Sequence, residues 1–359
     1  MIAGLSGVSG SQAASRPGSH FGRWASRSDG RRRTLRFAGS LALFCWFAYW
    51  SWDACKSLIL DPELIGIDGR IYYHGAASWL AGGDPWNSFV AVHDWAIHFN
   101  FAGPPPTLLA FAPATLISED AFVLGWLGLS LAAGRYVLRR LHLPIWWLLF
   151  PPLSVGMLSG NPQIVCLALL LSGSSWLRAL AAPMKAYAVL PLIGERRWRA
   201  LAILVGAGMV SLVIFRDLWL SYLQEFGQIS ATLDAQSLGG FSATIDPRLF
   251  AVTALAIVVL AVLDRRAAGW LIVPALWPSS QLHYSTLAMP VMTPWLSVGL
   301  AVVGRGLPPV VICVYVAWRV ARPLWALLRL RTSRMLGLGL AIARDEDYSD
   351  RPGGHVPMT

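Results

Sequence analysis

The sequence predicts an all-α, polytopic integral membrane protein. Of its 359 residues, 55% are hydrophobic and 13% are charged, whereas a soluble domain carries about a quarter charged residues. Mean hydropathy is +0.53. Apolar stretches of spanning or near-spanning length recur from residue 35 to residue 330. The 18 tryptophans suit the membrane–water interfaces, where one edge of the ring is apolar and the other is hydrated.

The two ends of the chain are polar. Residues 1–34 are rich in serine, glycine and arginine and predict a disordered basic cytoplasmic tail. The basic run Arg31-Arg32-Arg33 comes late, and the apolar segment after it lacks a small-residue cleavage site. We therefore expect an uncleaved membrane anchor. Residues 331–359 predict a polar C-terminal tail, with the transmembrane domain at 35–330.

About 10–12 transmembrane helices are expected in this domain. Several apolar stretches are shorter than about 20 residues and are broken by proline or glycine. Broken helices are tolerated where the backbone is buried in protein or lines a hydrated cavity, so the pattern predicts a polar cavity. The candidate spans are 35–58, 103–118, 121–138, 143–158, 161–173, 175–194, 199–215, 249–263, 268–279, 284–303 and 308–329.

Basic clusters indicate the orientation, because cytoplasmic loops carry an excess of lysine and arginine. With the N-terminal tail inside, counting spans places the 59–102 loop on the outer face, together with the 216–248 loop and the 279–284 turn. The clusters at 196–199 and 265–266 then lie inside. A third cluster, at 135–140, falls outside. Either the segment near 143–158 is re-entrant or the rule fails there.

Several classes of partner and cofactor are not indicated. The net charge of +10 sits in short clusters beside apolar runs, which is typical of topology signals and contacts to anionic lipid rather than of nucleic-acid binding. No metal and no cofactor are expected, since we find no glycine-rich phosphate loop after a strand and no suitable carboxylate cluster. The four cysteines, which show no CxxC or Cys/His spacing, are Cys45, Cys55, Cys166 and Cys313.

The 59–102 loop contains the most informative stretch of the chain. Residues 67–88 read IDGRIYYHGAASWLAGGDPWNS, and the loop is too long and too aromatic for a simple connector. Its apolar spacing, with Tyr72, Ala76, Trp79 and Leu80 on one helical face, predicts a short helix lying flat at the interface. Asp68 lies at the start of this helix. It could be an N-cap, a residue that faces a substrate, or both.

This stretch resembles the first extracytoplasmic loop of glycosyltransferase family 87, whose pattern reads Asp-Phe-x-x-Tyr-Tyr, then Ala-Ala, then Leu-x-Gly-x-Asp-Pro-Tyr. Further segments resemble family motifs in the same order over residues 65–295. They are Asn100–Leu108 with Ala112-Pro113, Gly160-Asn161-Pro162-Gln163, Met184-Lys185-Ala186-Tyr187 with Pro191, Gln236-Ser237-Leu238, and Pro278–Tyr284. The chain departs from the pattern where Asn161-Pro162-Gln163 scrambles the usual turn, where Gln281 replaces a tryptophan, and in a short 161–194 helical pair.

The resemblance implies a GT-C-like fold in the inner, cytoplasmic membrane. It also implies an inverting hexosyltransferase, with mannose as the first choice of sugar. The donor would be a polyprenyl-phosphate sugar, and the acceptor a hydroxyl of a glycolipid or glycan on the extracytoplasmic face. No nucleotide-sugar pocket is implied.

This chemistry needs a base for the hydroxyl and positive charge or donors near the leaving phosphate. Asp68 is the predicted general base. Lys185 is the candidate for neutralising the phosphate, because an uncompensated lysine in an apolar segment is costly; it could instead snorkel to the interface. His283 could bind phosphate or acceptor, or make a structural hydrogen bond. Arg70 could pair with Asp68, meet phosphate, or be a solvated loop charge.

The remaining candidates for donor or substrate binding follow from their motif positions. Asp84 also fits ordinary turn chemistry, because it precedes Pro85 and follows two glycines. These candidates are Tyr72, Tyr73, Asp84, Asn161, Gln163 and Gln236.

Three other functions stay open on the sequence. A secondary transporter also has broken helices, but we find no inverted repeat, and the carboxylate lies in a loop rather than at the bilayer midplane. A lipid flippase without transferase chemistry is the second alternative, and an inactive pseudo-enzyme is the third.

Overall fold

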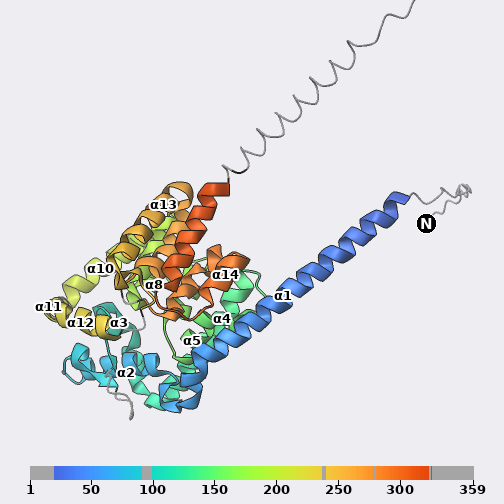
Figure 1. Ribbon diagram of the computed structural model, residues 1–359. Helices are drawn as coiled ribbons and strands as arrows, with labels where there is room; N and C mark the ends of the chain where they lie inside the picture. The colour runs from blue at the N-terminus through green and yellow to red at the C-terminus, as the bar shows by residue number, and fades with distance from the viewer. Residues whose placement is uncertain (1–19, 91–98, 237–239, 279, 323–324, 326–359) are drawn as a thin grey trace, which may run out of the picture. The chain divides into compact units, whose positions relative to one another are not determined.

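The computed structural model describes residues 20–90, 99–236, 240–278, 280–322 and 325. The chain forms two compact units, Met1–Cys45 and Trp46–Thr359. Within the first unit, the described residues belong to helix α1 (His20–Leu60), which continues into the second. The described part of the second unit is helical apart from one short β-ribbon, as the all-α prediction expects (Figure 1).

The segment after α1 forms the predicted short helix. It contains η1 (Pro62–Leu64), α2 (Ile67–Leu80) and η2 (Pro85–Asn87), followed by strands β1 (Phe89–Val90) and β2 (Phe99–Asn100). The strands pair antiparallel, with Phe89 opposite Asn100. Helix α2 buries Tyr72 and Ala76 of the predicted apolar face, whereas Trp79 is half-buried and Leu80, at the end of the helix, is 55% exposed.

A long helix follows two short ones. The chain passes through α3 (Pro105–Phe111) and η3 (Ala112–Leu116) into α4 (Glu119–Arg140). The Ser118 hydroxyl caps α4 by accepting from the Ala121 N–H at 3.4 Å. Acidic residues occupy the first turn and Arg139 and Arg140 the last, which suits the helix dipole. At 22 residues, α4 is about 33 Å long.

Helices α5 (Pro151–Leu158) and α6 (Gln163–Leu170) follow η4 (Ile145–Leu149) and form a bent pair, at 117° to each other. The end of α5 meets the start of α2, where the Gly66 N–H donates to Leu158 O at 2.8 Å. The end of α6 meets the end of α4, where Arg140 Nε donates to Leu171 O at 3.3 Å. The pair therefore starts near the Arg140 end of α4, approaches α2, and comes back to the Arg140 end. This path favours the re-entrant alternative for the 143–158 segment.

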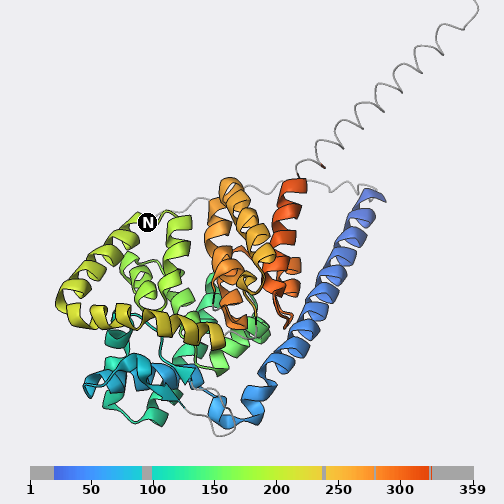
Figure 2. The same cartoon turned by 60° about the vertical axis from the view of Figure 1, so that its left-hand side comes forward.

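The next segment is made of short helices. Four pieces, α7 (Ser175–Ala179), α8 (Ala181–Met184), η5 (Ala186–Ala188) and α9 (Val189–Gly194), occupy the predicted 175–194 span. Helix α10 (Trp198–Ile214) follows, and α11 (Arg216–Gln224) turns away from it by 93° (Figure 2). Helix α12 (Phe226–Gln236) continues from α11.

The last part of the chain contains a kinked helix. After η7 (Ala243–Ile245), α13 (Pro247–Leu276) leaves the helical region at Asp264 (φ −156°, ψ 82°), so it consists of two arms. The Asp264 carboxylate accepts from the Ala267 N–H at 3.0 Å and from Arg319 Nη2 at 3.1 Å. These bonds fix the kink to the helical residues 307–322. Between them lie η8 (Leu282–Val291) and α14 (Pro294–Leu300).

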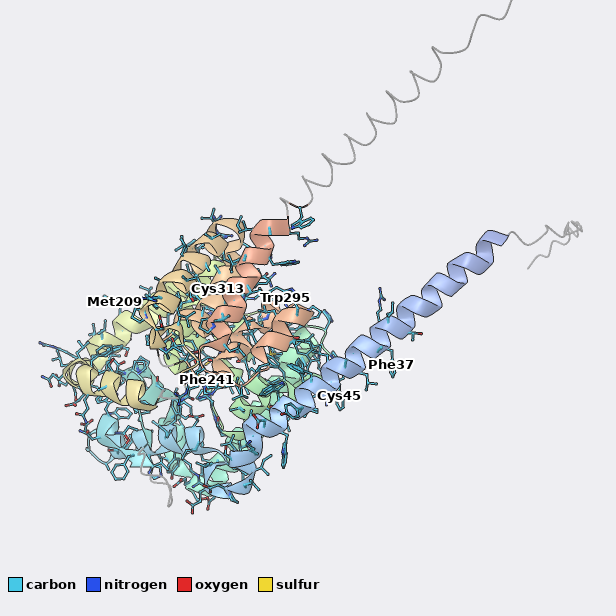
Figure 3. All side chains as sticks on the ribbon, viewed as in Figure 1. Phe37, Cys45, Met209, Phe241, Trp295 and Cys313 are labelled. Atoms are coloured by element: carbon cyan, nitrogen blue, oxygen red, sulfur yellow. The ribbon has the colours of Figure 1, made fainter. Side chains whose placement is uncertain are left out.

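Among the described residues, α4 and α13 are long and apolar enough to cross a membrane. Up to four segments qualify if the bent pairs α5–α6 and α10–α11 each count as one span. Apolar side chains point outward from these helices, as Met209 does on α10 with 59% exposure (Figure 3). The sequence predicts more spans than these. Three of the predicted spans, at 103–118, 175–194 and 284–303, consist of helices of ten residues or fewer, so they do not qualify.

Candidate functional site

A cavity of about 510 Å³ in the second unit is lined by charged, polar and aromatic side chains. Its walls come from α2, the segment before α3, the α5–α6 turn, Met184–Tyr187, helices α11 and α12, and the Trp277–Tyr284 segment. These segments are far apart in the sequence. Of the predicted site residues, Asp68, Tyr72, Asn161 and Lys185 line the cavity.

Asp68 is the second residue of α2, and it is not the N-cap. Gly66 occupies the N-cap position in the left-handed region (φ 75°) and offers no side chain. The Asp68 N–H donates to Ser159 O at 2.8 Å, so the C-terminal carbonyls of the α5 turn take up the first N–H groups of α2. No described group donates a hydrogen bond to the Asp68 carboxylate. That carboxylate is therefore available to a ligand.

Three glycines allow this close approach. A Cβ on Gly66 would lie 2.5 Å from Val123 Cγ1 on α4, and one on Gly160 (φ 69°) would lie 3.3 Å from Gly66 Cα. A Cβ on Gly69 would lie 3.2 Å from the Trp126 ring. Trp126 Nε1 in turn donates to Gly160 O at 2.6 Å. The start of α2 is thus packed against both α4 and the α5–α6 turn, which fixes the position of Asp68.

Lys185 lies between α8 and η5, with its ammonium group held among aromatic rings. Its Nζ is 5.5 Å from the centre of the Tyr72 ring and 5.7 Å from that of Tyr284, within the range of cation–π attraction. Burial on its own lowers the pKa of Lys185. The phenols of Tyr284 and Tyr72 and the carboxylate of Asp68 outweigh burial and raise the pKa, so the side chain carries a charge at neutral pH.

Aromatic rings form much of the cavity wall. Tyr187 contacts the rings of Tyr284 and Trp277, with centroids 5.0 Å and 5.1 Å away. Tyr72 is buried and stacks on Phe111 at 4.7 Å. Burial raises the pKa of Tyr72 to about 12, so its phenol is neutral and can act as a hydrogen-bond donor.

Two predicted residues lie behind the wall rather than in it. Gln163 is fully buried and accepts from the Tyr187 hydroxyl, while its backbone N–H donates to Asn161 Oδ1 at 3.0 Å. His283 is 2% exposed and stacks against Tyr284 at 4.8 Å. Burial lowers the pKa of His283 to about 4, so it is neutral at pH 7 and cannot supply a positive charge to a phosphate.

The other predicted residues have structural partners. Arg70 pairs with Glu119 at 2.7 Å and Asp120 at 3.5 Å at the start of α4, and not with Asp68. Glu119 is fixed to α2 a second time through His74 Nε2, at 3.1 Å. Arg70 therefore links α2 to the first turn of α4, where both carboxylates lie.

Tyr73 and Asp84 also point to contacts outside the cavity. The Tyr73 hydroxyl donates to Ile117 O at 3.0 Å, and its ring stacks on Phe122 at 5.6 Å. Asp84 accepts from the Trp86 N–H at 2.9 Å and from Asn87, so it caps η2 as turn chemistry suggests. The side chain of Gln236 lies outside the described residues.

Several residues of the wall were not predicted from the sequence. Tyr187, Trp277, Gln281 and Tyr284 lie within or beside the motif segments at 184–187 and 278–284, which is the signal that could have identified them. Tyr222 on α11 also lines the cavity, and no motif marks it. In the described part of the chain, no cluster of three or more His, Cys, Asp or Glu side chains is arranged to hold a metal ion.

The cavity and the arginine clusters lie at opposite ends of α4. Asp68 and Arg70 on α2 lie at its Glu119 end, and the Arg140 end meets Leu171 at the end of α6. Glu195 after α9 binds Arg197 at 2.9 Å and Arg266 at 3.1 Å. The basic residues that the sequence analysis could not reconcile, at 135–140, are thus on the side of α6 that carries the other arginines.

Comparison of the chain with protein-family models, curated proteins and solved structures finds no match in any of the three.

Proposed function

We propose that this protein is a GT-C-like membrane hexosyltransferase of the inner membrane that takes a sugar from a polyprenyl-phosphate donor. One observation carries the proposal. The Asp68 carboxylate, which has no hydrogen-bond partner among the described residues, and the ammonium group of Lys185 share one cavity with aromatic walls. A base for a hydroxyl and a cation for a phosphate are the two groups that such a transfer needs.

In the proposed reaction, the oxygen of the acceptor hydroxyl attacks C1 of the donor sugar. Its proton passes to the Asp68 carboxylate as the new C1–O bond forms. The bond between C1 and the phosphate oxygen breaks, and the electron pair leaves with the polyprenyl phosphate. Lys185 stabilises the negative charge on that phosphate. Attack from the face opposite the leaving group inverts the configuration at C1.

The surrounding residues have supporting roles in this proposal. Tyr72 and Asn161 line the cavity and can donate to sugar or phosphate oxygens. The rings of Tyr187, Trp277 and Tyr284 offer apolar faces to a hexose. Gln163 and His283 hold Tyr187 and Tyr284 from behind, through the Tyr187 hydroxyl and ring stacking.

The positions of the charges support an outward-facing site. Arginines gather at the Arg140 end of α4 and the cavity lies at the Glu119 end. An excess of arginine marks the cytoplasmic end, so we place the cavity toward the extracytoplasmic face. Membrane lipid then surrounds α4, α10 and α13, whose outward side chains are apolar.

The test is an assay that separates transfer from transport. Protein in vesicles receives polyprenyl-phosphate mannose labelled in the sugar, together with an extract of membrane glycolipids. A transferase moves label to a new glycolipid or glycan and releases polyprenyl phosphate. A flippase or transporter moves the intact donor between leaflets and leaves the sugar–phosphate bond in place, and that result would overturn the proposal.

A further inference from the structure

Three arginines from separate elements gather beside the end of α6, far from the cavity. Arg140 ends α4, Arg178 belongs to α7, and Arg197 precedes α10. Arg178 Nε donates to Leu170 O at 3.2 Å and Arg140 Nε donates to Leu171 O at 3.3 Å. Both side chains therefore bind successive carbonyls at the C-terminus of α6.

The terminal nitrogens of these two arginines carry charge without a carboxylate partner. Within the described residues, no Asp or Glu oxygen lies in ion-pair contact with Arg140 or Arg178. The nearby acid, Glu195, already binds Arg197 and Arg266. Partial burial and the neighbouring charge of Arg197 lower the pKa of Arg178, Glu195 opposes them, and Arg140 lowers the pKa further. Arg178 therefore lies within electrostatic reach of both other arginines.

The surface beside the cluster is apolar and aromatic. Trp176 and Leu177 on α7 are 70% and 43% exposed, and Trp198 at the start of α10 is 62% exposed. Helices α7 and α10 pack against each other, so these side chains flank the arginines. Exposed tryptophans next to arginines are typical of the level at which lipid headgroups meet acyl chains.

We propose that Arg140, Arg178 and Arg197 form a binding site for the phosphate headgroup of an anionic phospholipid. Guanidinium groups bind phosphate oxygens with paired hydrogen bonds. One anion would neutralise Arg140 and Arg178, with Arg197, already paired with Glu195, at the edge of the site. The acyl chains would lie along Trp176, Leu177 and Trp198. This site is independent of the cavity and of the proposed transferase activity.

The test measures lipid binding to the purified full-length chain in a neutral detergent, by thermal stabilisation during titration. The probes are dioctanoyl phosphatidylglycerol, dioctanoyl phosphatidylcholine and inorganic phosphate. Wild-type protein should bind phosphatidylglycerol at least about 10-fold more tightly than phosphatidylcholine. The double variant Arg140→Gln/Arg178→Gln should lose roughly 10- to 30-fold of that affinity, since each basic residue contributes about 1 kcal/mol at an anionic surface.

Two further variants make the result specific. Arg135→Gln removes the same charge from an exposed position on α4 and should keep the wild-type affinity. Arg140→Lys/Arg178→Lys retains the charge without the planar guanidinium, so its affinity for phosphatidylglycerol should lie between those of wild type and the glutamine variant. It also provides a second test should the glutamine variant fold poorly. Equal binding of the two lipids, equal losses in Arg135→Gln and the double variant, or inorganic phosphate binding as tightly as the lipid would overturn the proposal.

Discussion

Asp68 is free for a ligand because its backbone, not its side chain, makes the local structural contacts. Its N–H and that of Gly66 bind carbonyls at the end of α5, and its carboxylate stays unpaired among the described residues. Lys185 is the complementary group, held over the Tyr72 and Tyr284 rings. The sequence motifs selected both residues, and both line the cavity. The partner of Arg70 could not be predicted, since Glu119 lies 49 positions away.

Lys185 should act through its charge on the donor phosphate. Lys185→Met should weaken binding of polyprenyl-phosphate mannose roughly 10- to 100-fold, because a charge-assisted hydrogen bond contributes about 1.5–3 kcal/mol. Lys185→Arg should retain part of the affinity. Donor titration of detergent-solubilised protein measures both, and equal affinity in Lys185→Met and wild type would leave only a packing role for this side chain.

His283 should make stability depend on pH. Its pKa is about 4 in the folded chain against about 6.5 when unfolded, so the unfolded chain binds more protons between these values. The free energy of unfolding that depends on neutral His283 is complete above about pH 6.5 and is lost as pH falls toward 4. Relative to His283→Asn, wild type should lose about 3 kcal/mol between pH 7 and pH 4.

Thermal unfolding across this pH range measures that loss, and His142→Asn is the control. His142 is exposed, so His142→Asn controls for the loss of a histidine from the surface. Parallel stability curves for wild type and His283→Asn would show that this histidine does not remain neutral in the folded protein.

At the scale of elements, α2 and α4 could be predicted from the sequence and the short helices could not. Periodic burial of Tyr72 and Ala76 identifies α2, and a long apolar stretch with acidic and basic ends identifies α4. Hydropathy does not distinguish several short apolar helices from one continuous span. For this reason α8, η5 and α9 were predicted as parts of a single span at 175–194. The joins between them depend on contacts such as that of Thr107 with Pro183 O, 76 residues apart.

The start of α2 should depend on the absence of a side chain at Gly66. Gly66→Ala introduces both left-handed strain and a contact at 2.5 Å with Val123, so it should cost about 2–4 kcal/mol of unfolding free energy. Gly82→Ala is the matched control. Gly82 has the same backbone (φ 77°) with nothing within 4 Å of the added Cβ, so the cost should be about 1–2 kcal/mol.

Denaturant or thermal unfolding in detergent compares the two alanine variants. Adding Val123→Ala to Gly66→Ala should recover part of the loss, because it removes the contacting methyl groups. Equal losses at Gly66 and Gly82, or no recovery in the double variant, would contradict the packing described for the start of α2.

At the scale of the molecule, charge separates the two ends of α4. The sequence could not place Arg135, Arg139 and Arg140, because counting spans assumes that every apolar segment crosses the membrane. In the structure, α6 ends beside Arg140, so Arg140 lies at the same end of α4 as Arg178 of α7. The excess of arginine then predicts that the Arg140 end of α4 faces the cytoplasm.

Thiol labelling should report this orientation. In intact cells an impermeant maleimide should label Ser88→Cys, next to η2, and should label Arg139→Cys only after lysis. The parent protein sets the background from its four native cysteines. The reverse pattern would place the cavity on the cytoplasmic side.

The central claim, that Asp68 is the general base, is tested most directly by the transfer rate of Asp68→Asn. The Asp68 carboxylate accepts no capping bond from the described residues, so the amide should leave folding and donor binding close to wild type. It cannot accept the acceptor's proton, so the rate should fall on the order of 10²–10⁴-fold. Asp84→Asn, which alters a cap that does not line the cavity, should transfer sugar at nearly the wild-type rate. A folded Asp68→Asn protein that binds donor and transfers sugar within a few-fold of wild type would contradict the account.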